Sequence, residues 1–212
     1  MKKGPVVCGA PIFLLALAAP PAMAVHVSSK GFKGGLTIAN MTGYFLCLGY
    51  DARIGSVFGV YAMFNLPRSF SLQPKMLFVE KVTKETETSF DVEWSDVLRL
   101  TYLEIPAPAR YSYVESKKLT VFGYAGPAVA VKIEATRHWE WGDESGLEDV
   151  DRIKSKDFGI VLGEAVEILS GKNVVIINTR YTLGLWNYFI KEAAQGPTVK
   201  NWALQALVGL GF

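Results

Sequence analysis

Apolar side chains recur at every second position along several stretches of about ten residues. The stretch 202–212, WALQALVGLGF, shows this pattern most clearly. Because successive side chains of a β-strand point to opposite faces, it predicts a strand with one apolar face and one small or polar face. The apolar face would consist of Trp202, Leu204, Ala206, Val208, Leu210 and Phe212.

The same pattern predicts eight strands whose connections alternate in length. The predicted strands cover residues 31–39, 55–65, 69–80, 98–113, 119–133, 157–168, 174–184 and 202–212. Short connections lie at 65–67, 115–118 and 170–172, and long ones at 40–54, 81–97, 134–156 and 185–201. An even number of strands with alternating short and long connections is typical of outer-membrane barrels, which have short periplasmic turns and longer outer loops.

The surroundings of the barrel decide which face of each strand points outward. In lipid every backbone N–H and C=O group needs a partner within the protein, and a closed barrel supplies one to each without leaving an edge. We therefore predict an all-β protein, an eight-stranded antiparallel up-and-down transmembrane β-barrel, with its apolar face toward hydrocarbon. Aromatic residues near the segment ends suit interfacial girdles. They are Tyr111, Tyr113, Trp186, Tyr188 and Trp202.

The opposite face of the predicted strands carries ionisable and amide side chains, which should form a polar network in the lumen. Its members are Lys33, Gln73, Lys75, Glu104, Arg110, Asn178 and Arg180, together with Gln205. At eight strands side chains fill the interior, so a general diffusion pore is not expected. A nearly symmetric hairpin would set Lys75 opposite Glu104, although Arg110 or Arg180 could reach Glu104 instead. Pro106 and Pro108 each remove a ladder donor and predict a bulge.

The chain begins with the features of an export signal. Lys2 and Lys3 precede a short apolar stretch that ends in Ala22-Met23-Ala24, as in a secretory signal peptide. We predict a signal peptide over 1–24 and a barrel domain over 25–212, located in the bacterial outer membrane. Removing residues 1–24 removes two lysines and no acidic residue, which leaves a net charge near zero. No nucleic-acid partner is expected from that balance.

Several motifs in order resemble the PorT-like family of outer-membrane β-barrel proteins. They are FKGGLTIANMTG (32–43), FSLQPKMLF (70–78), YLEIPAPARY (102–111), YAGPAVAV (124–131), DFGIVLG (157–163), TRYTLGL (179–185) and the terminal VGLGF. The resemblance implies an eight-stranded barrel in the outer membrane of Gram-negative bacteria of the Bacteroidetes type. The family takes its name from a protein linked to secretion and gliding, and most of its relatives have no assigned activity. Lys75 occupies a position that is often acidic in the family.

The residues support a structural or docking role better than an enzymatic one. A lipid-modifying enzyme would need a nucleophile and a base, and His138 with Ser145 is the one conceivable dyad. A secreted lipocalin-like barrel that binds a small apolar ligand is a second alternative, and it would carry its apolar face inward. Only Cys47 remains after residue 24, which excludes an intramolecular disulfide and a cysteine-based zinc cluster. The acidic run 142–151 lacks the spacing of an EF-hand loop, so neither a metal nor another cofactor is expected.

The expected partners follow from the fold. They are outer-membrane lipid, the barrel-assembly machinery and envelope proteins that contact the long loops. Phe212 ends an alternating strand, and a terminal aromatic residue is the signal that the insertion machinery reads in outer-membrane barrels.

Overall fold

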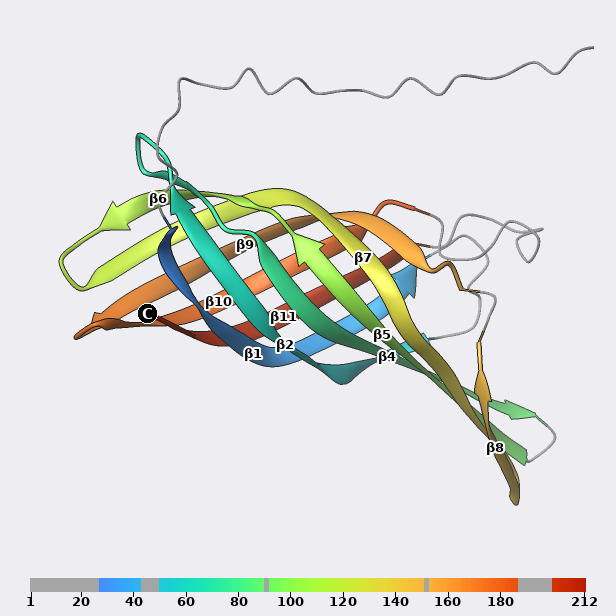
Figure 1. Ribbon diagram of the computed structural model, residues 1–212. Helices are drawn as coiled ribbons and strands as arrows, with labels where there is room; N and C mark the ends of the chain where they lie inside the picture. The colour runs from blue at the N-terminus through green and yellow to red at the C-terminus, as the bar shows by residue number, and fades with distance from the viewer. Residues whose placement is uncertain (1–26, 43–49, 90–91, 151–152, 187–199) are drawn as a thin grey trace, which may run out of the picture.

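The computed structural model describes residues 27–42, 50–89, 92–150, 153–186 and 200–212 (Figure 1). The predicted signal peptide lies outside these residues. The described chain forms β1 (Val27–Thr42), β2 (Tyr50–Asn65), β3 (Phe70–Leu72), β4 (Lys75–Ser89), β5 (Val92–Pro106), β6 (Ala109–Glu115), β7 (Leu119–Trp141), β8 (Glu144–Asp149), β9 (Lys156–Ser170), β10 (Asn173–Gly184) and β11 (Lys200–Gly211). Within the same residues no helix is long and apolar enough to cross a membrane.

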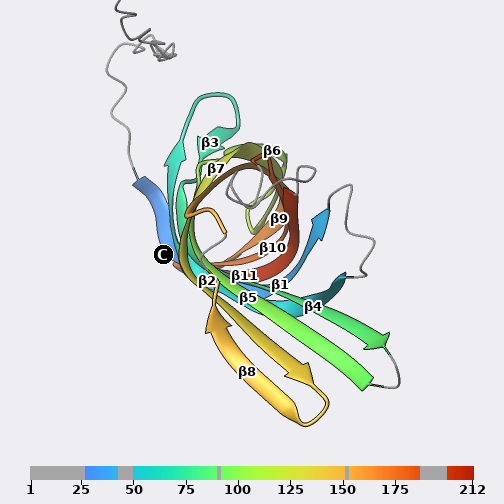
Figure 2. The same ribbon diagram turned by 90° about the vertical axis from the view of Figure 1, so that its right-hand side faces the viewer.

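The strands close into a ring of eight. All the pairings are antiparallel, and β1 contacts both β2 and β11, which joins the first and last strands. Short β3 continues as β4, and β5 continues as β6, so each of these pairs fills one place in the ring. β8 pairs with β7 alone and lies outside the ring (Figure 2). The predicted eight-stranded antiparallel barrel is confirmed.

Prolines lie at the two breaks in the ring strands, one between β3 and β4 and the other between β5 and β6. β3 ends before Pro74, and β5 ends at Pro106, two residues before Pro108. The Gln73 N–H donates to the Pro108 carbonyl at 3.0 Å, and the Ala107 N–H donates to the Pro127 carbonyl at 3.0 Å. The predicted bulge at these prolines is wrong, because the pairing with β7 keeps one register through the interruption. The neighbouring carbonyls receive other donors, so the ladder continues without an extra residue.

The apolar face of the barrel points outward. Large exposed side chains follow the strands around the ring, and they include Phe32, Leu36, Phe58, Phe78, Leu162, Ile177, Leu204 and Leu210. The buried positions between them hold the charged and amide side chains. A lipocalin-like barrel has the opposite arrangement, so that alternative fails.

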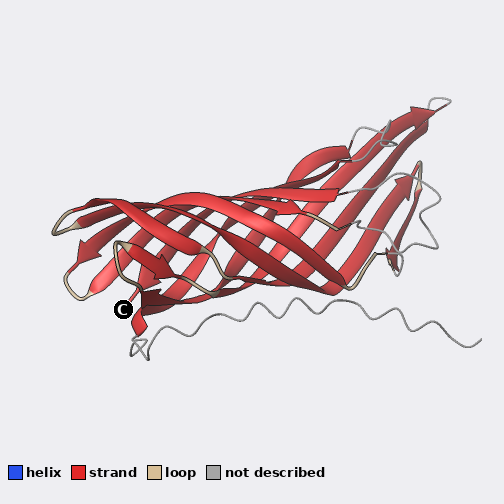
Figure 3. Ribbon diagram, turned by 90° about the horizontal axis from the view of Figure 1, so that it is seen from above, coloured by secondary structure: helices blue, strands red, loops and turns tan. Residues whose placement is uncertain are grey.

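The short turns agree with the sequence, but two of the predicted long loops are mostly strand. β4 and β5 continue as a hairpin through most of 81–97, and β7 runs on to Trp141 before β8 returns along it. These extensions form a flap, comprising residues 83–89, 92–97 and 134–149, which projects beyond the ring (Figure 3). Alternating Val, Thr and charged residues can pair as strands in water when ion pairs cross between them.

Arg137 is the ionic centre of this flap. Its Nε lies 2.6 Å from Asp96 Oδ2 and its Nη1 lies 3.1 Å from Glu148 Oε1. Partial burial lowers the pKa of Arg137, but its hydrogen bonds with Asp96 and Glu148 and their negative charges outweigh burial and raise that pKa above its ordinary value. The arginine thus holds β5, β7 and β8 together as a permanent cation.

Candidate functional site

The candidate site is the lumen, where the predicted polar residues are all buried. Lys33 lies on β1, Glu104 on β5, Arg110 on β6, and Gln205 on β11. Gln73 follows β3, Lys75 begins β4, and Asn178 and Arg180 lie on β10. The strands alternate through these positions, so an inward position is fixed once the outward apolar face is known. What alternation does not fix is which inward groups meet.

Arg180 is the most buried cation among the described residues, and it pairs across the lumen. Its Nη2 lies 3.0 Å from Glu104 Oε1, with side chains that are 1% and 2% exposed. Its Nε donates to Gln205 Oε1 at 2.5 Å. Three strands, β5, β10 and β11, are therefore joined through one guanidinium. A planar guanidinium suits this place because it offers several fixed donors at once.

The predicted contact between Lys75 and Glu104 is wrong. β4 and β5 pair with Leu77 opposite Glu104, which sets Lys75 two residues further along. The ladder pairs Ser89 with Val92, so every residue of β4 lies opposite a residue of β5 two positions beyond the one expected. Lys75 instead places its Nζ 4.2 Å from the centre of the Tyr124 ring.

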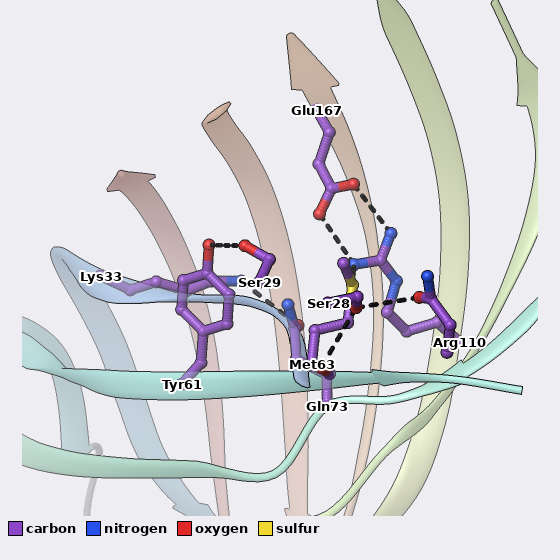
Figure 4. Close-up of polar contacts among 9 residues, drawn as sticks. Ser28, Ser29, Lys33, Tyr61, Met63, Gln73, Arg110 and Glu167 are labelled. Atoms are coloured by element: carbon purple, nitrogen blue, oxygen red, sulfur yellow. Dashed lines mark hydrogen bonds and ion pairs between the residues drawn. The ribbon is translucent and has the colours of Figure 1, made fainter. Parts of the chain in front are cut away.

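A second ion pair lies at the end of the barrel that has the short turns. Arg110 Nη1 and Nη2 donate to the two carboxylate oxygens of Glu167 at 2.7 and 3.0 Å (Figure 4). The same guanidinium lies 3.5 Å from the centre of the Phe122 ring. The pair borders a cavity of about 310 Å³ whose lining is mostly polar. Glu167 was missed from the sequence, although it shares the inward parity of Val161 and Ala165.

Aromatic rings partner the buried lysines. Lys33 Nζ lies 4.8 Å from the centre of the Tyr61 ring and donates to Gln73 Oε1 at 3.4 Å (Figure 4). Lys81, which the sequence did not single out, lies 5.1 Å from the centre of the Tyr102 ring. The negative face of an aromatic ring attracts a cation, more strongly where water is scarce. Rings thus take the place of some of the carboxylates that the lysines lack.

Hydrogen bonds complete the network toward both ends. Asn178 Nδ2 donates to the Tyr124 hydroxyl at 2.9 Å, and that hydroxyl donates to the Thr179 carbonyl at 3.2 Å. Nearer the flap, Lys81 Nζ donates to Asn201 Oδ1 at 3.1 Å, and Asn201 Nδ2 donates to Asp157 Oδ2 at 2.7 Å. Asp157 and Asn201 stand at strand ends, where sequence alternation is least informative.

The structure describes both members of the conceivable catalytic dyad, His138 and Ser145. In the flap His138 is opposite Leu147, while Ser145 is opposite Glu140, and His138 Nδ1 lies 3.8 Å from Glu140 Oε1. The conceivable dyad of His138 and Ser145 is therefore not formed as a hydrogen-bonded pair. The described residues also contain no group of three potential metal ligands. Chemically, the charged and amide side chains of the lumen are joined by ion pairs, hydrogen bonds and contacts with aromatic rings.

Several solved structures are similar to the chain at low sequence identity. Ail, the attachment invasion locus protein of Yersinia pestis, matches with 10% identity and a TM-score of 0.42, over 87% of this chain and 98% of that one. OprG from Pseudomonas aeruginosa matches with 7% identity and a TM-score of 0.47, over 87% and 95%. Neisserial surface protein A matches with 11% identity and a TM-score of 0.40, over 85% and 95%. No protein of curated function matches the chain.

The family model for the outer membrane protein beta-barrel domain matches residues 26–189. This span contains β1 to β10, and β11 then closes the ring on β1. The apolar outer wall and the buried charges agree with that match. So does the grouping of short connections at one end of the barrel and long ones at the other. The chain belongs to the outer membrane protein beta-barrel domain family, and it is an integral β-barrel of the bacterial outer membrane.

Proposed function

We propose that the barrel is a non-enzymatic anchor in the outer membrane, with a closed lumen and a flap that docks envelope proteins. The observation that carries this is the set of contacts across the lumen. Arg180 bridges to Glu104 and Arg110 to Glu167, and each pair joins strands that are not neighbours in the ring. Side chains tied in this way fill the space that a solute would need.

Conductance tests the closed lumen. We expect the refolded barrel to give no large, stable single-channel steps in planar bilayers. The variant Lys33→Ala/Lys75→Ala/Arg110→Ala removes three buried side chains and should raise conductance if it still folds. Heat-modifiable migration on a gel verifies folding of both proteins. Large steps from the unaltered barrel would contradict the proposal.

The flap is the proposed docking element. It extends beyond the barrel, and Trp141 and Leu147 on it are 62% and 72% exposed. A photocrosslinker at position 147 should capture envelope proteins in native membranes, whereas one at Lys172, in the short turn between β9 and β10, should not capture the same species. Equal capture from both positions would argue against the flap.

We further propose that the chain is a PorT-like member of its family. The quoted motifs support this, although Lys75 departs from the acidic residue expected there. In this structure Lys75 contacts Tyr124, so a lysine at that position has a partner without an acidic network.

Assembly is proposed to depend on the terminal aromatic. The Phe212 ring lies 6.1 Å from the Phe32 ring and 5.6 Å from Lys30 Nζ, beside the seam where β1 and β11 close the barrel. Deleting Phe212 should reduce folded protein in the membrane several-fold, because the insertion machinery loses its signal. Phe212→Tyr is the matched control and should assemble normally. Unchanged heat-modifiable protein after the deletion would exclude this dependence.

A further inference from the structure

One carboxyl group lies in the middle of the lipid-facing wall. The outward positions of β9 are apolar from Ile160 to Ile168, except for Glu164. Glu164 is exposed, and it forms no hydrogen bond or ion pair with the part of the chain that the structure describes. Ionisable groups at this depth are costly and normally have a partner. The wall therefore presents an acceptor that no group in the described part of the chain satisfies.

Glu164 lies in a groove on that wall. The groove has a volume of about 750 Å³ and crosses β6, β7, β9 and β10. Its floor contains Ala109, Gly123 and Ala125, and Gly123 lies directly opposite Glu164. A Cβ built on Gly123 would make ordinary van der Waals contacts, with its nearest atoms at 3.9 Å, so a side chain can be added there without a clash.

A ridge borders the groove on the side of β10 and β11. Tyr181 and Leu204 form it, and the Tyr181 ring stacks with Trp202 at a centroid distance of 6.2 Å. Among the described residues the Tyr181 hydroxyl also has no hydrogen-bond partner. The wall thus carries an unpaired acceptor in the groove and an unpaired donor on the adjacent ridge.

We infer that this groove and ridge form the interface between two copies of the chain. In a two-fold pair the same patch is used twice, so each ridge enters the groove of the other copy. The small floor residues allow the two walls to approach closely, as in other membrane interfaces. The Tyr181 hydroxyl of the second copy then donates to Glu164, and the reciprocal bond forms at the same time. A basic partner protein fits less well, because the wall supplies both halves of the bond itself.

The test is the oligomeric state of the full mature chain in lipid nanodiscs or mild detergent. Native mass spectrometry and sedimentation should show a dimer. Gly123→Leu fills the groove and should abolish it. Gly34→Leu is the matched control, because Gly34 faces lipid on β1, where a Cβ also has ordinary contacts of 3.7 Å or more. It should leave the dimer intact.

Two further variants separate the polar contact from packing. Tyr181→Phe and Glu164→Leu should each weaken dimerisation roughly ten- to a hundredfold, because each removes both symmetric hydrogen bonds. Glu164→Gln keeps an acceptor and should restore most of the affinity. Heat-modifiable migration confirms that each barrel is folded. A wild-type monomer at all concentrations, a monomer carrying a bound lipid, or a dimer that Gly123→Leu and Tyr181→Phe leave unchanged would overturn the inference.

Discussion

At the scale of single residues, the lumen combines ion pairs with buried lysines that contact aromatic rings. Alternation along the strands was sufficient to place Lys33, Glu104 and Arg180 inside, because lipid demands an apolar outer face. It did not give their partners. A pair across the lumen depends on the register of every intervening strand, and a two-residue shift in the register of one hairpin moves each contact. The sequence therefore left Lys75, Arg110 and Arg180 as candidate partners of Glu104, and the structure selects Arg180.

Glu104→Gln should destabilise the barrel by about 2–4 kcal/mol, because it leaves Arg180 buried without its counter-ion. Urea unfolding in lipid vesicles, followed by tryptophan fluorescence, measures the loss. The double variant Glu104→Gln/Arg180→Gln should recover part of it. Lys75→Gln serves as the comparison, and its effect should add to that of Glu104→Gln. Additivity for Arg180 and coupling for Lys75 would reverse this assignment.

At the scale of elements, the short turns and the strands within the membrane followed the sequence, but the flap did not. Loop predictions rest on polarity, and residues 83–89, 92–97 and 134–149 are rich in polar side chains, of which some are buried, such as Thr83 and Ser95. Charged residues can pair as strands there, as the contacts of Arg137 with Asp96 and Glu148 show. Polarity alone thus cannot separate a solvated hairpin from a loop.

The base of the flap is stabilised by a small apolar cluster. Ile153 is 1% exposed and packs with Leu100, Tyr102 and Ala135. Ile153→Ala should weaken this cluster by about 2–4 kcal/mol, so the flap opens while the ring stays closed. Limited proteolysis should then cut near residues 150–155 much faster, with heat-modifiable migration unchanged. Loss of the folded band would mean that flap and ring unfold together. Ile133→Ala, at an exposed position, is the control.

At the scale of the whole molecule, the barrel has two unlike ends. The short turns and Phe212 lie at one end and the flap at the other (Figure 1). An even number of strands returns the chain to its starting side, so the short-turn end should face the periplasm and the flap the exterior. The lengths of the connections predict from the sequence which of them share each end of the barrel.

Cysteine labelling tests the orientation. In a Cys47→Ser background, Ser145→Cys lies in the flap and Ser170→Cys at the short turn between β9 and β10. A membrane-impermeant maleimide applied to intact cells should label position 145 and spare position 170. Both should react after the outer membrane is permeabilised. Labelling at 170 alone in intact cells would invert the topology.

The contacts across the lumen also constrain how the protein can evolve. Glu104 and Arg180 lie on β5 and β10, far apart in the chain, yet neither can change alone without leaving the other buried and unpaired. The same constraint applies to Arg110 and Glu167. Related barrels should therefore inherit these positions as couples, exchanging both charges or losing both. The outer wall, which only has to stay apolar, is free to drift one residue at a time.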